Sequence, residues 1–88
     1  MSDTTMRIAR RFLALGGRLM IDPAGKLVEG ISVAALFGPD LSDRERAHAL
    51  RVNRAISALG SRRRAETRRL IQQHGHALPS GWVVWGVR

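Results

Sequence analysis

The segment at residues 82–87 has the composition of a β-strand, because it combines two tryptophans with three valines. Trp82 and Val84 would lie on one face of this strand, and the residues between and after them would lie on the other. Both faces are therefore apolar, and monomers rarely leave such a surface exposed. The chain must cover this strand with two layers of its own, with a second copy of itself, or with a partner protein.

The two tryptophans of this strand have two interpretations. In a small domain, a tryptophan more often belongs to the core than to a contact surface. An exposed tryptophan would instead anchor a protein interface or stack on a base. Because Trp82 and Trp85 would point to opposite faces, we treat both as candidate protein-interface residues.

A β-hairpin is predicted upstream of this strand. Residues 18–22 alternate in the manner of a strand, and residues 26–29 form the returning strand. Between them, Asp22 and Pro23 suit the first two positions of a β-turn and Gly25 suits the last. The hairpin and the 82–87 strand together predict a small antiparallel sheet of three strands.

The pattern Ser-Asp-Arg-Glu at residues 42–45 is a capping box and the clearest local signal in the chain. The serine hydroxyl can accept a hydrogen bond from the backbone of the glutamate, whose carboxylate can accept one from the backbone of the serine. The helix should end near Leu59, and Ser61 should cap a second helix that ends near residue 74. Glycine inside a helix costs only about 1 kcal/mol, so one kinked helix over 43–74 is the alternative.

Two further helices complete the expected elements. One is capped by Thr4 or Thr5 and ends near Leu15, with its apolar residues on one half of the helical wheel and its three arginines on the other. The other is short, starting after Ser32 and ending at Phe37. The predicted fold class is therefore α+β in the order α-ββ-α-α-α-β, with the small antiparallel sheet packed against three to four helices. Residues 1–88 should form a single small domain.

Composition argues against membrane and disulfide classes. No apolar run approaches the roughly 18–20 residues that cross a bilayer. The chain has no cysteine, which excludes disulfides and thiolate metal sites. Residues 6–15 are amphipathic and lack acidic side chains, as transit peptides do, but the interpretation as a first helix is favoured. We expect a cytoplasmic protein with no membrane partner.

The net positive charge lies entirely in the second half of the chain. Residues 1–43 carry five basic and five acidic side chains, whereas residues 44–88 carry ten arginines and two glutamates, which gives the whole +8. A one-sided basic field attracts polyanions, and the planar guanidinium group matches phosphate oxygens in pairs. This asymmetry indicates a nucleic-acid partner, DNA or RNA, and the alternative is a solvated face of an arginine-rich protein.

The candidate nucleic-acid-binding residues are arginines of the two expected helices over 43–74. On a helical wheel they flank the apolar stripe of the first helix and form two rows on the second, with Ala65 between the rows. Such rows would contact phosphates. The candidates are Arg44, Arg51, Arg54, Arg62, Arg63, Arg64, Arg68 and Arg69.

The sequence gives little support for a helix-turn-helix motif, a metal site or a catalytic site. The break at Gly60 invites comparison with a helix-turn-helix, but the position six residues later, where an apolar anchor is usual, holds Glu66. His74 and His76 could coordinate a metal ion together, but no cysteine or nearby carboxylate completes a structural zinc site. No nucleophile motif, glycine-rich phosphate loop or carboxylate cluster is present. We therefore expect no enzyme activity, no metal and no cofactor.

The sequence predicts a non-catalytic nucleic-acid-binding protein that uses an arginine-rich helical face, at about residues 44–69, to contact phosphates. The alternative function is a small inhibitor or adaptor of the phage-accessory or anti-defence type. Such a protein would dock on an acidic protein or on the nucleic-acid-binding surface of another protein. The apolar faces of the 82–87 strand favour that alternative, or a homodimer.

Overall fold

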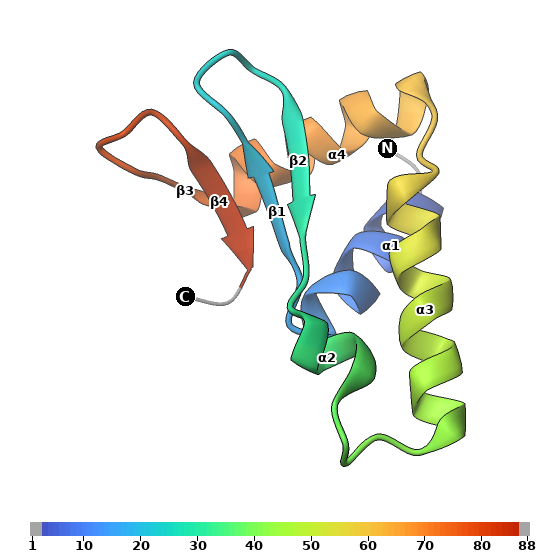
Figure 1. The fold of residues 1–88 in the computed structure, drawn as a ribbon. Coiled ribbons are helices and arrows are strands. Elements are labelled where there is room, and N and C mark those ends of the chain that lie inside the picture. The colour runs from blue at the N-terminus through green and yellow to red at the C-terminus, as the bar shows by residue number, and fades with distance from the viewer. Residues whose placement is uncertain (1–2, 87–88) are drawn as a thin grey trace.

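The computed structural model describes residues 3–86, and this part of the chain forms four helices and a four-stranded antiparallel sheet (Figure 1). The elements are α1 (Asp3–Ala14), β1 (Arg18–Ile21), β2 (Leu27–Gly30), α2 (Val33–Phe37), α3 (Asp43–Ser57), α4 (Ser61–His74), β3 (His76–Ala77) and β4 (Val83–Gly86). The α+β class and the order α-ββ-α-α-α-β are confirmed. One strand, β3, is additional. Val87, which we expected to continue the last strand, lies outside the described residues.

The strands lie in the order β2-β1-β4-β3. The hairpin forms as its turn residues predict, with the Gly25 N–H donating to the Asp22 carbonyl at 2.9 Å and the Lys26 N–H donating to Asp22 Oδ1 at 2.8 Å. Gly25 has a φ of 89°, which glycine adopts without steric cost. The expectation of three strands is corrected, because β3 pairs with β4 where a loop was expected. Two residues are too few for any sequence pattern to reveal a strand.

One face of the sheet packs on α1 and α4; in Figure 1, α4 passes behind the strands and α1 lies beside them, toward α3. Leu19 and Ile21 of β1 point to this side and join the buried cluster that includes Phe12 of α1 and Ile71 of α4. Helix α3 packs against α1, with Val52 and other apolar residues turned inward. The core therefore lies between the sheet and α1, α3 and α4.

Within residues 3–86, no helix covers the opposite face of the sheet. Met20 is paired with Val28 on one side and with Val84 on the other, so the three side chains form one apolar row. All three are half-buried. Figure 1 shows no helix in front of this face, so β4 has a covered side and an open side.

The first helix differs from its expected start. Helix α1 already includes Asp3, so neither Thr4 nor Thr5 caps it. Thr5 lies inside the helix with only 1% of its surface exposed. Its hydroxyl faces α4, and its partners there are described with the site.

Residues 43–74 form two helices, which excludes the single kinked helix. Helix α3 ends at Ser57, and α4 begins at Ser61 after the extended residue Gly60. We expected Ser61 to cap α4, but Gly60 occupies the cap position and no side chain caps the helix there. In Figure 1, α4 runs at a large angle to α3.

The capping box of α3 is complete and carries a pH-dependent contribution to stability. The Glu45 N–H donates to Ser42 Oγ at 3.2 Å, and the Ser42 N–H donates to Glu45 Oε1 at 3.2 Å. Hydrogen bonding to the Ser42 side chain, and then to its backbone, lowers the pKa of Glu45 below its usual 4.5. A lowered pKa stabilises the fold above the unfolded-state pKa, and this contribution is lost as the pH falls through the folded-state value.

We therefore expect the difference in unfolding free energy between wild type and Glu45→Gln to be present at neutral pH and to disappear as the pH falls through the lowered pKa of Glu45. Glutamine keeps an acceptor oxygen, so this comparison isolates the charge. Urea denaturation over a series of pH values from neutral to acidic measures the difference. A difference that is equal at every pH would show that the charge of Glu45 does not contribute.

Candidate functional site

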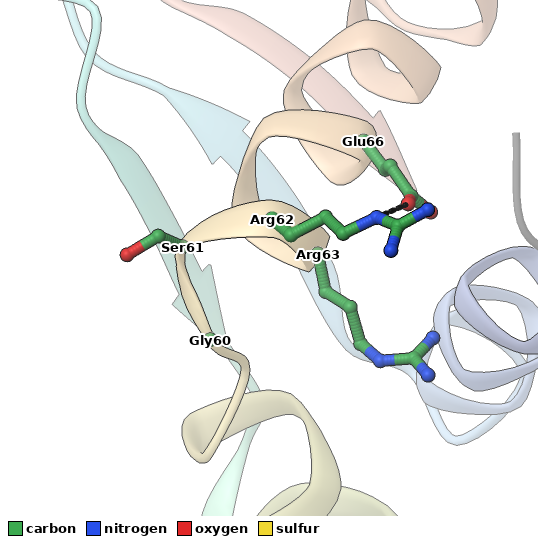
Figure 2. A pocket seen from close by; sticks show the side chains of 5 residues that line it. All are labelled: Gly60, Ser61, Arg62, Arg63 and Glu66. Carbon is green, nitrogen blue, oxygen red and sulfur yellow. Dashed lines mark ion pairs between the residues drawn. The ribbon is translucent and has the colours of Figure 1, made fainter.

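Arg63, on the first turn of α4, turns back toward α1. Its Nη1 donates to Thr5 Oγ1 at 3.1 Å, and the Thr5 hydroxyl donates to Glu66 Oε2 at 2.7 Å. Figure 2 shows the guanidinium group of Arg63 extending toward the neighbouring helix while Arg62 reaches across to Glu66. The Arg62 Nε lies 3.6 Å from Glu66 Oε1. These contacts tie the start of α4 to α1.

Arg64 also makes bonds within the protein. Its Nε donates to the Leu59 carbonyl at 3.0 Å, and its Nη2 donates to the Ser57 carbonyl at 3.4 Å. The last carbonyls of a helix lack intrahelical donors and carry partial negative charge, so a guanidinium group stabilises them. Arg64 thus caps the C-terminal end of α3 from the next helix. Phosphate contact by Arg63 and Arg64 stays a prediction, and both side chains have a structural role as well.

The other arginines of α4 lie on its outer side. Thr67, Leu70 and Ile71 are buried on the inner side. Arg62 has 93% of its side chain exposed although it pairs with Glu66, Arg69 is exposed, and Arg68 is half-buried. The two rows seen on the helical wheel therefore begin with side chains that bond internally and continue toward solvent at Arg68 and Arg69.

Helix α3 presents a second group of outward arginines. Its buried residues are Ala49, Val52 and Ile56. Arg44, Arg51 and Arg54 are all exposed. Helices α3 and α4 run in different directions (Figure 1), so their candidate arginines do not line up along a single helical face.

A groove runs between α1 and α3. One hollow of about 450 Å³ is lined by Ile8 and Arg11 of α1 and by His48, Arg51, Val52 and Ala55 of α3. A second hollow of about 520 Å³ shares His48 and Arg51 and extends toward α2; its other lining residues are Leu15, Ala35, Leu41, Arg44, Glu45 and Ala49. We call the two hollows together the α1–α3 groove. It combines an apolar floor with a rim that is mostly basic.

Arg11 belongs to this rim and was missed at the level of sequence. The first half of the chain has zero net charge, so its arginines attracted no functional interpretation. The helical wheel placed Arg11 on the polar half of its helix, but the wheel carries no information about which helix packs alongside. The fold brings Arg11 to the same hollow as Arg51 of α3.

The two candidate interface tryptophans lie at different places. Trp85 is on the helix-covered side of the sheet, packs against the core and stacks on His74 with ring centroids 5.2 Å apart. Trp82 precedes β4 and is half-buried. A more exposed apolar pair was missed: Val33 and Phe37 of α2 are 73% and 54% exposed. Their spacing of four residues in a short helix was the available signal.

Among residues 3–86, no three histidine, cysteine or carboxylate side chains lie close enough together to hold a metal ion. His74 is occupied by its stacking contact with Trp85, and His76 is exposed in β3. Among the described helices, none is both long enough and apolar enough to span a bilayer.

Comparison with models of protein families, with curated proteins and with solved structures finds no match to this chain. The side chains described above, and the charge that they carry, are therefore the basis for the functional proposal.

Proposed function

We propose that this protein is a non-catalytic nucleic-acid-binding protein that contacts phosphates through the outward arginines of α3 and α4. The observation that carries the proposal is the one-sided charge, with ten arginines against two glutamates in residues 44–88. A field of this kind concentrates polyanions and speeds their association.

The positions of the two glutamates support this proposal. Glu66 bonds to Thr5 and pairs with Arg62, and only 12% of its side chain is exposed. Glu45 is exposed, but its carboxylate accepts the Ser42 backbone N–H in the capping box. The outer surface of α4 therefore offers a polyanion mainly cationic groups.

The proposed binding mode has little sequence discrimination. Arginine contacts to phosphate position a protein on nucleic acid without reading bases. Base stacking needs exposed aromatic rings, but α3 and α4 contain no phenylalanine, tyrosine or tryptophan, and Trp85 is stacked on His74. Affinity should therefore depend on charge and salt more than on sequence.

A salt titration tests the proposal. We expect fluorescently labelled duplex and single-stranded oligonucleotides to bind at low salt, with log K falling by about 0.9 per phosphate contact on duplex DNA for each unit of log salt. The variant Arg54→Ser/Arg68→Ser/Arg69→Ser removes three outward arginines and should flatten the slope by about two to three units.

The matched control removes the same charge elsewhere. Arg7, Arg10 and Arg18 are exposed and lie outside α3 and α4, so their triple substitution by serine also lowers the net charge by three. We expect it to change the slope much less. No binding to either oligonucleotide at low salt would contradict the proposal, and equal effects of the two triple variants would show that only total charge matters.

A further inference from the structure

Phosphate binding would use the arginines of the α1–α3 groove but not its apolar surface. Its floor includes Ile8 and Ala55, which are half-buried and so still present apolar surface to solvent. A phosphate backbone can pair with the arginines of the rim but offers nothing to an apolar floor. Surfaces that combine an apolar floor with a charged rim are typical of protein interfaces.

The arginines of the rim require an occupant that carries negative charge. Arg11 stands on the α1 side, and Arg44 and Arg51 stand on the α3 side. Arg44 and Arg51 are seven residues apart on one helix, a separation of about 10 Å along its axis. Carboxylates two turns apart on a partner helix have the same spacing. Glu45 lines one end of the groove, and its carboxylate is held there by the Ser42 N–H at 3.2 Å.

A second copy of this chain does not supply such an occupant. Each copy carries a net charge of +8, so two copies repel at a basic rim. The helix of this chain with the most carboxylates is α3, which has only Asp43 and Glu45, both near its start. It also turns its apolar residues into the core. A helix with carboxylates on both sides of an exposed apolar stripe would fill the floor and pair with the rim.

We infer that the α1–α3 groove docks an acidic amphipathic helix of a partner protein. The apolar stripe of the helix lies on Ile8 and Ala55, and its carboxylates pair with Arg11, Arg44 and Arg51. Arg54, Arg68 and Arg69, whose substitution tests nucleic-acid binding, do not line this groove. When the groove is occupied, Arg44 and Arg51 pair with the acidic helix, and phosphate contact is left to Arg54 and the outward arginines of α4.

The probe is a fluorescein-labelled helical peptide of about 18 residues, long enough to be helical in isolation. It has leucines at i, i+3, i+4 and i+7 spacing and glutamates on both flanks; a second peptide carries lysine at every glutamate position. By fluorescence anisotropy we expect the glutamate peptide to bind wild type at least about tenfold more tightly than the lysine peptide.

Two variants locate the site. Arg11→Ser/Arg51→Ser should weaken the glutamate peptide about tenfold or more, whereas the control Arg7→Ser/Arg10→Ser, with the same charge change on exposed α1 residues, should have a smaller effect. Ala55→Trp fills the floor and should also remove binding, with thermal melting as the check that it folds. If Ala55→Trp does not fold, the serine pairs decide the question.

Two results would overturn the inference. One is equal binding of the two peptides, or equal effects of the two serine pairs. The other is a loss of oligonucleotide affinity in Ala55→Trp as large as its loss of peptide affinity, which would make the groove part of the nucleic-acid surface. The salt slope of the Arg54→Ser/Arg68→Ser/Arg69→Ser variant tests nucleic-acid binding, and the peptide affinities test the groove. Either proposal can therefore fail without the other.

Discussion

Gly75→Ala should destabilise the protein by about 3 kcal/mol, a large part of the net stability of a domain of this size. A Cβ at Gly75 would lie 2.6 Å from the Ile71 carbonyl oxygen and 2.7 Å from the Val84 carbonyl oxygen. Both atoms belong to the backbone, so neither can swing aside as the end of a side chain can. Either α4 or β4 must shift, and these two elements pack on one another.

The matched control for this substitution is Gly30→Ala. A Cβ there would meet the Met20 Cε at 3.6 Å, an ordinary contact with the end of a flexible side chain. We expect urea denaturation, followed by tryptophan fluorescence, to give a much lower midpoint for Gly75→Ala and a small change for Gly30→Ala. Similar midpoints for the two variants would mean that α4 and β4 separate readily at Gly75.

The second large effect is expected at Glu66, where stability and nucleic-acid affinity should change in opposite directions. Its carboxylate accepts the hydroxyl of the buried Thr5 and pairs with Arg62. Glu66→Ala leaves that hydroxyl without this acceptor, at a cost of about 2 kcal/mol. The same change raises the net charge from +8 to +9 and releases Arg62 for phosphate contact.

Glu66→Gln separates the two effects. Glutamine keeps an acceptor oxygen for Thr5, so it should cost only about 1 kcal/mol while still releasing Arg62. Oligonucleotide titration should show tighter binding for both variants, with the salt slope steeper by up to about one unit. Unchanged affinity would place Arg62 outside the binding surface. A loss of stability in Glu66→Gln equal to that in Glu66→Ala would assign the stabilisation to the charge rather than to the hydrogen bond.

Local patterns predicted the local features of this fold. The capping box at Ser42 and the turn after Asp22 formed as expected, because each depends on hydrogen bonds between residues at most four positions apart. The α+β class followed from the hairpin and the strand signal near the C-terminus. Strand β3 could not be predicted, since His76 and Ala77 are extended only because β4 lies beside them.

The candidate site shows where a helical wheel stops being informative. The wheel gives the direction of each Cβ, but an arginine side chain is long enough to reach groups on another element. Arg63 reaches Thr5, which lies 58 positions away in sequence, and Arg64 reaches the carbonyl of Ser57, the last residue of the previous helix. The groove beside Arg11 likewise exists only because α1 and α3 pack together. Long-range packing therefore decides which arginines bond internally and which remain available.

The strand order β2-β1-β4-β3 sets when the sheet can be completed. Strand β4 is the last described strand in sequence, yet it occupies an inner position between β1 and β3. During synthesis, β1 and β2 must therefore wait as a two-stranded hairpin, with only α1 made before it to cover one face, until residues 83–86 have emerged. The chain cannot build this sheet in the order in which its strands are made, because the strand made last joins the two halves of the sheet.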